Sequence, residues 1–203
     1  MLKLICAGFF LLLSFTADAA GTLLIVGDSL SAGYGLGQDQ AWPVLLARRL
    51  AEQRLDYSVV NASISGDTSA GGRSRIGAAL EQSRPALVIV ALGGNDGLRG
   101  LPLATLHDNL GAILKAVRQR KARAVLVGMK LPPNYGADYT RGFERTYAEL
   151  ARTHRAALVP FLLDGIAERP ELFQADGIHP TAAAQPLLLE NVWKTLGPLL
   201  KQP

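Results

Sequence analysis

The stretch TLLIVGDSLSAGYG, residues 22–35, joins an apolar, β-prone run to a loop of small and polar residues. Apolar runs of the same kind recur at 57–60, 86–92, 122–128 and 157–161. Each run is near-continuous rather than alternating, which is typical of parallel strands. We therefore expect five parallel strands, each buried on both faces of one sheet.

Helical patterns separate these runs, with apolar residues spaced three and four apart. One stripe consists of Leu106, Leu110, Ile113, Leu114 and Val117, and another of Tyr139, Phe143, Tyr147, Leu150 and Ala151. We expect Thr105 with Asp108 to cap the first of these helices, and Asp138 to cap the second. A last helix is expected over 181–200, where Pro186 should bend it or delay its start.

Strands that alternate with helices predict an α/β fold: a doubly wound, flavodoxin-like sheet of five parallel strands with helices on both faces. In such sheets, ligands bind outside the carboxyl ends of the strands. No repeat, low-complexity segment or linker divides the chain, so we expect a single domain over 20–203.

The composition fits a folded globular protein, because 49% of the 203 residues are hydrophobic and 19% are charged. Disordered, collagen-like and coiled-coil chains have other compositions. The net charge is only +4. The densest basic run, Arg118, Arg120, Lys121 and Arg123, is expected to end a helix and form a solvated face rather than a nucleic-acid patch.

The first 19 residues have the pattern of a secretory signal peptide. Lys3 precedes an apolar run at 4–15, and Ala17-Asp18-Ala19 forms a cleavage site. The run is shorter than the ~20 residues that span a bilayer. We expect a periplasmic or secreted protein without stable membrane insertion. The single cysteine, Cys6, lies in this segment, so disulfides and thiolate chemistry are excluded for the mature chain.

Potentially catalytic residues cluster after the predicted strands. Ser29 follows the first strand, and His179 has a carboxylate, Asp176, three residues before it. If 176–179 makes one helical turn, Asp176 can hold one imidazole nitrogen while the other faces outward. An isolated Ser29 would be interpreted as a helix cap, but a serine with a base and an orienting carboxylate is typical of a nucleophile.

Gly66 and Asn95 follow the second and third strands, and both can donate hydrogen bonds to an oxyanion. Gly66 can adopt backbone angles closed to other residues and bring its N–H close to a substrate. Asn95 offers a side-chain amide. Taken alone, both residues fit ordinary turns. His107 and His154 fall within helical patterns, where packing or surface roles are expected.

Other motifs are absent from the sequence. Residues 33–38 lack the G-x-G-x-x-G spacing, no Gly-Lys pair suits a P-loop, and no G-x-S-x-G forms a nucleophile elbow. No histidine pair has metal-ligand spacing. We therefore expect no cofactor, no metal and no nucleic-acid partner.

Four separated blocks resemble the SGNH hydrolases, also called the GDSL esterase/lipase family. They are Gly27-Asp28-Ser29-Leu30, the block around Gly66, Gly93-Gly94-Asn95-Asp96, and Asp176-Gly177-Ile178-His179-Pro180. Within the family, the chain is similar to small exported bacterial enzymes that act as acyl-CoA thioesterase, arylesterase and lysophospholipase. The resemblance implies a cofactor-independent hydrolysis of acyl esters and thioesters.

By the same resemblance, Ser29 is the nucleophile, His179 the base and Asp176 its orienting carboxylate. The implied oxyanion donors are the N–H groups of Ser29 and Gly66 with the Asn95 side chain.

The loop 131–136 matches one that borders the acyl chain, so Leu131 and Tyr135 are predicted to contact substrate. The substrate is expected to be a small acyl ester or thioester, including lysophospholipid, and the protein a monomer. A carbohydrate acetylesterase on the same scaffold is an alternative, and a non-catalytic lipid- or glycan-binding module is another.

Overall fold

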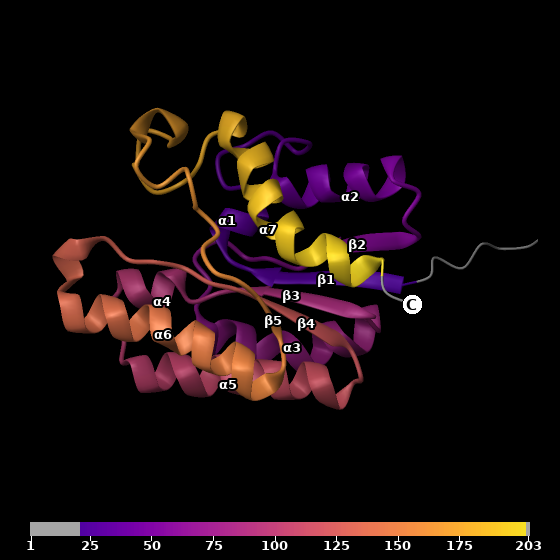
Figure 1. Cartoon of the computed structure of the whole chain (residues 1–203), viewed down its shortest axis with the longest axis horizontal. Coiled ribbons are helices and arrows are strands. Elements are labelled where there is room, and N and C mark those ends of the chain that lie inside the picture. The colour runs from indigo at the N-terminus through magenta and orange to yellow at the C-terminus, as the bar shows by residue number, and fades with distance from the viewer. Residues whose placement is uncertain (1–20, 202–203) are drawn as a thin grey trace, which may run out of the picture.

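The computed structural model describes residues 21–201, which form one parallel sheet with helices on both faces (Figure 1). The strands are β1 (Gly21–Gly27), β2 (Tyr57–Asn61), β3 (Leu87–Ala91), β4 (Arg123–Val127) and β5 (Ala157–Val159). The α-helices are α1 (Ser29–Ala32), α2 (Trp42–Glu52), α3 (Ser69–Ser83), α4 (Gly94–Leu98), α5 (Leu103–Gln119), α6 (Ala137–His154) and α7 (Gln185–Leu200). Short 3₁₀ helices cover Pro133–Tyr135, Pro170–Leu172 and Ala182–Ala184. The predicted signal peptide lies outside the described residues.

The strand order is β2-β1-β3-β4-β5, with every neighbouring pair parallel. This is the predicted flavodoxin-like order, in which the chain changes direction between β1 and β3. In folds with this order, ligands bind outside the carboxyl ends of the strands at that point. Ser29 and Asn95 lie in the short helices α1 and α4 that follow those two strands.

Two apolar layers hold the sheet between the helices. On one face, α2 and α7 pack against inward side chains such as Leu23, Ile25 and Ile89. On the other face, α3, α5 and α6 pack against Leu24, Val26 and neighbouring residues. Figure 1 shows the two groups of helices above and below the strands. Consecutive residues of β1 therefore point into different cores, which explains its near-continuous apolar sequence.

The expectation that all five strands are buried on both faces is wrong for β2. This strand lies at the edge of the sheet, and Val60 is 39% exposed. An apolar, β-branched run suits an edge strand as well as a central one, so the run did not reveal its position. The strand β5 ends at Val159 rather than 161, because Pro160 has no N–H for the ladder.

The predicted helix caps are also wrong. The helix α5 begins at Leu103 after Pro102, so Thr105 and Asp108 lie inside it. The helix α6 begins at Ala137, so Asp138 lies in its first turn, where its charge suits the helix dipole. The delayed start of the last helix is confirmed, since α7 begins at Gln185 with Pro186 in its first turn.

The basic run is placed partly as expected. Arg118 lies in the last turn of α5, which ends at Gln119. Arg123, however, is a half-buried residue of β4 that donates hydrogen bonds to the Leu199 carbonyl and the Tyr57 hydroxyl. The expectation of a solvated face therefore fails for Arg123. Within residues 21–201, no helix is both long and apolar enough to cross a membrane.

Candidate active site

Ser29 is the first residue of α1, separated from the end of β1 only by Asp28. The cap of this short helix is Asp28, whose Oδ1 accepts a hydrogen bond from the Leu30 N–H at 3.0 Å. The capping residue is therefore Asp28 and not Ser29. The Ser29 hydroxyl is free for another partner, and its N–H lies at a helix N-terminus, where backbone donors have no partner within the helix.

His179 and Asp176 lie in a loop closed by a bridge between Phe173 and Pro180. The distance from His179 Nδ1 to Asp176 Oδ2 is 2.6 Å. The loop is not the helical turn that the spacing suggested. Instead, Asp176 Oδ1 accepts the N–H groups of Ile178 and His179 at 2.9 and 3.0 Å, and Gly177 adopts a φ of 66°. These backbone hydrogen bonds fix the position of the Asp176 carboxylate that contacts the imidazole.

The second imidazole nitrogen points at the serine. His179 Nε2 lies 2.9 Å from Ser29 Oγ, although the two residues are 150 positions apart in the chain. The structure thus brings together Ser29, His179 and Asp176 in the order needed for proton transfer from a hydroxyl. The pKa of Asp176 is lowered to about 2 by the His179 N–H, then by the His179 side chain and the Ile178 N–H. This carboxyl is therefore ionised near neutral pH.

Two residues that the sequence did not single out hold the histidine loop against the serine loop. The Tyr34 ring lies 4.4 Å from the His179 ring, centroid to centroid. The Gln174 side-chain amide donates to the carbonyls of Tyr34 and Pro180, at 2.8 and 3.2 Å. Gln174 therefore joins the chain on either side of the Ser29–His179 contact.

Gly66 and Asn95 lie on segments that are joined by hydrogen bonds. Gly66 has a φ of 79°, which L side chains rarely adopt, and its missing Cβ would meet no atom within 4 Å. The glycine is therefore required by its backbone angle. Asn95, in the first turn of α4, donates to the Asp67 carbonyl at 2.9 Å. The second proton on the same amide nitrogen is available for another acceptor.

A buried polar cluster fixes the loop that carries Gly66 to α4. Asp96 is 1% exposed and accepts hydrogen bonds from both the N–H and the hydroxyl of Ser69. Asn109 of α5 donates to the Ser69 hydroxyl at 3.0 Å. Since Ser69 begins α3 just after Gly66, and Asp96 follows Asn95, this cluster sets the distance between the two candidate donors.

Arg75 of α3 joins the loops after β1 and β2. Its guanidinium lies 2.8 Å from the Asp67 carboxylate and also donates to the carbonyls of Ala62 and Gly27. Gly27 directly precedes Asp28 and Ser29. No local sequence signal distinguishes Arg75 or Ser69 from ordinary helix residues, because their partners are distant in the chain.

Asp28 is a second carboxyl close to the histidine, and it is only 4% exposed. Burial raises its pKa from 3.8 to about 6, against the opposing effects of the Leu30 N–H and the charge of His179. Asp28 belongs to the first of the four matching blocks but was not among the predicted site residues. Its buried charge has a cost in stability that can be measured.

The loop predicted to contact substrate lies beside α4. Leu131 is half-buried, and its side chain packs close to Gly97 and Phe143. The Tyr135 hydroxyl donates to the Leu98 carbonyl at 3.0 Å. Both residues therefore have packing roles, and their contact with substrate stays a prediction.

The remaining histidines lie on helices, as expected. His107 is on α5 with a ring nitrogen 3.4 Å from Asp108, and His154 is the last residue of α6. Among the residues that the structure describes, no group of three or more His, Cys, Asp or Glu side chains is arranged to hold a metal.

Comparison with known proteins gives consistent similarities over nearly the whole chain. Residues 25–186 match the profile of the GDSL-like Lipase/Acylhydrolase family. Esterase TesA of Pseudomonas aeruginosa is 52% identical over 201 residues, covering 98% of this chain and all (100%) of that protein. Thioesterase 1/protease 1/lysophospholipase L1 of Escherichia coli K12 is 45% identical over 192 residues, covering 95% of this chain and 91% of that protein.

A solved structure has the same fold. The psychrotrophic esterase EstA of Pseudoalteromonas sp., in a crystal structure inhibited by monoethylphosphonate, superposes with a TM-score of 0.85. It is 38% identical in sequence, and the match covers 89% of this chain and 99% of that one.

Proposed function

The chain belongs to the GDSL-like lipase/acylhydrolase family, and from that premise we propose that it is an exported serine esterase that hydrolyses acyl esters and thioesters. One observation carries the proposal. Ser29 Oγ lies 2.9 Å from His179 Nε2, while His179 Nδ1 lies 2.6 Å from Asp176. This arrangement stands at the carboxyl edge of the sheet, beside Gly66 and Asn95.

Acylation begins at Ser29. Its Oγ attacks the acyl carbonyl carbon while His179 Nε2 accepts the hydroxyl proton. Asp176 holds the opposite nitrogen of the ring, so the proton-accepting nitrogen faces the serine and the imidazolium is stabilised as it forms. The carbonyl oxygen becomes an oxyanion, and the N–H groups of Ser29 and Gly66 and the Asn95 amide donate to it.

The tetrahedral intermediate then collapses. The bond to the alcohol or thiol breaks, His179 returns its proton to that leaving group, and Ser29 stays acylated. Water next attacks the acyl-enzyme while His179 accepts a proton from it. Departure of the serine oxygen, reprotonated by His179, releases a carboxylic acid and restores the starting state. All atoms come from substrate and water, so no cofactor takes part.

The substrate class follows from the relatives' names and from the surroundings of the site. The relatives include an esterase and a thioesterase/lysophospholipase. Large apolar side chains are exposed on the segments that carry the proposed catalytic residues: Tyr34 (53%), Ile64 (53%), Leu98 (40%, the last residue of α4) and Ile178 (48%). Such a rim favours a substrate with an apolar acyl chain, such as a lysophospholipid.

The proposal includes export and a monomeric state. Residues 1–19 carry the pattern of a cleavable signal, which leaves a single domain over 20–203 in the periplasm or outside the cell. A carbohydrate acetylesterase would use the same residues. It would favour acetyl esters, whereas the apolar rim favours longer chains.

The test is a series of p-nitrophenyl esters from acetyl to palmitoyl, with an acyl-CoA thioester, on three mature proteins: the wild type, Ser29→Ala and Ser74→Ala. Ser74 is an exposed serine of α3 and serves as the control. Ser29→Ala should lose roughly 10⁴-fold or more of kcat while remaining folded, and Ser74→Ala should stay active. A preference for acetyl over octanoyl ester would favour the carbohydrate acetylesterase instead.

A further inference from the structure

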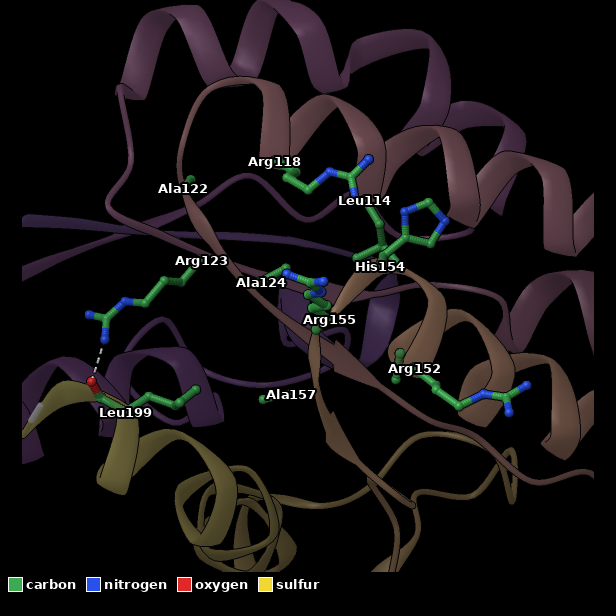
Figure 2. A pocket seen from close by; sticks show the side chains of 12 residues that line it. Leu114, Arg118, Ala122, Arg123, Ala124, Arg152, His154, Arg155, Ala157 and Leu199 are labelled. Atoms are coloured by element: carbon green, nitrogen blue, oxygen red, sulfur yellow. Dashed lines mark hydrogen bonds between the residues drawn. The ribbon is translucent and has the colours of Figure 1, made fainter.

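A cavity lies at the edge of the sheet opposite Ser29, where β4 and β5 begin and α5 and α6 end (Figure 2). Its volume is about 660 Å³, within the range of sites that bind small molecules. None of the residues that line it belongs to the proposed catalytic site. Any ligand bound here is therefore separate from the substrate of the proposed function.

The cavity is lined by arginines with no acidic residue among the lining. Arg123 is already bound to the Leu199 carbonyl and the Tyr57 hydroxyl. The other three, Arg118, Arg152 and Arg155, make no ion pair and no side-chain hydrogen bond with any residue in 21–201. Guanidinium groups of this kind are well suited to carboxylate or phosphate, which they bind through two parallel hydrogen bonds.

The C-terminal dipoles of the two helices do not balance this charge. Both α5 and α6 end here, and each helix end is equivalent to roughly half a negative charge. Together they offset about one cation, whereas three guanidiniums have no partner within residues 21–201.

Burial, first, and then the charge of the nearby Arg118 lower the pKa of His154. Its Nδ1 atom is buried without a hydrogen-bond partner among the described residues.

The floor of the cavity is apolar. It includes Leu114, Ala122, Ala124, Ala151 and Leu199. A small inorganic anion would pair with the arginines and leave this floor in water, and an uncharged chain would leave the arginines unpaired. A ligand with an acidic head and an apolar tail would satisfy both surfaces.

We propose that this cavity binds an anionic amphiphile, a single apolar chain with a carboxylate or phosphate head. Arg118 and Arg155 hold the head, and the apolar floor contacts the chain. In Figure 2, Arg123 is directed to the Leu199 carbonyl and Arg152 points away from the middle of the group, which leaves Arg118 and Arg155 for the head.

The test is calorimetric titration of the mature protein with decanoate and with decyl phosphate. Decanol and inorganic phosphate serve as probes of the tail alone and the head alone. The variant is Arg118→Gln/Arg155→Gln, and the control is Arg48→Gln/Arg145→Gln, which removes the same charge at exposed positions outside the cavity. Arg118→Gln alone is a second variant in case the double variant does not fold.

We expect at least one amphiphile to bind the wild type and the control equally, and the double variant at least about tenfold more weakly. The single variant should lose part of the affinity. The double variant should hydrolyse p-nitrophenyl acetate as fast as the wild type, which separates this site from Ser29. The stronger of the two amphiphiles identifies the head group.

Four results would overturn the proposal. The first is that neither amphiphile binds, and the second is that decanol binds as tightly as decanoate. The third is that inorganic phosphate binds as tightly as decyl phosphate. The fourth is that the control variant loses as much affinity as the cavity variant, which would assign the effect to net charge.

Discussion

Replacement of Asp28 by asparagine should stabilise the protein at pH 8 and have little such effect at pH 4. Asparagine has the same shape and can accept the Leu30 N–H through its own Oδ1, so the cap of α1 is retained. What the substitution removes is a charge at a site that is 4% exposed. The variant therefore isolates the cost of burying that charge.

The size of the effect follows from the pKa of Asp28. Burial raises it from 3.8 to about 6 in the folded protein. Between these values the folded state holds a proton that the unfolded state has released, so wild-type stability falls as pH rises. A rise of about two pKa units corresponds to ~3 kcal/mol. The loss of wild-type stability is complete above pH ~6 and absent below pH ~4.

The assay is urea unfolding of wild type and Asp28→Asn at each pH from 4 to 8, followed by circular dichroism. The difference in free energy of unfolding, variant minus wild type, should increase by ~3 kcal/mol over this range, mostly below pH 6. Asp176→Asn is the matched control. Its carboxyl has a lowered pKa, so the stability it contributes is present above its unfolded value and lost only in more acidic solution. Its difference should change little between pH 5 and 8. A pH-independent difference for Asp28→Asn, or one that decreases with pH, would refute the reasoning.

Three further variants test the neighbouring residues. Asn95→Ala should lower kcat about 10²- to 10³-fold with little change in KM, because an oxyanion donor acts mainly in the transition state. An unchanged kcat in steady-state kinetics would make Asn95 a turn residue only. Leu131→Ala should lower kcat/KM for octanoyl and longer esters but leave acetyl and butyryl esters unaffected. The loss should be up to ~0.8 kcal/mol for each acyl methylene that no longer packs on the loop. An equal decrease at every acyl length would show that Leu131 acts only by packing on Phe143. Ser69→Ala should lower the free energy of unfolding by about 1–3 kcal/mol, because the buried Asp96 carboxylate loses one hydrogen-bond donor. A melting temperature equal to that of the wild type would contradict this prediction.

The sequence predicted a flavodoxin-like sheet of five parallel strands and the residues that meet at its carboxyl edge. The second prediction holds because parallel strands bring all their carboxyl ends to the same edge of the sheet, whatever the length of the connections. Position within the sheet was harder, since the apolar run of β2 has the composition of a buried strand and lies at the edge. The prediction of the helix caps failed because Pro102 and Gly136 precede α5 and α6 and offer no capping side chain.

The supporting residues of the site could not be read from local sequence. Ser69 and Asp96 are 27 residues apart, and Arg75 contacts Gly27 across 48 positions. Each looks like an ordinary helix or turn residue in its own segment. Only the folded chain brings a hydroxyl, a carboxylate and a guanidinium beneath the loops that carry Ser29, Gly66 and Asn95.

The most direct test of the proposed mechanism is covalent labelling of the mature protein with a fluorophosphonate, followed by peptide mapping. A serine activated by a histidine attacks phosphorus and keeps the adduct. We predict one label per chain, attached to Ser29, in step with the loss of esterase activity, and no label on Ser29→Ala. Stoichiometric labelling of another residue, or full activity after Ser29 is labelled, would contradict the assignment of Ser29 as the nucleophile.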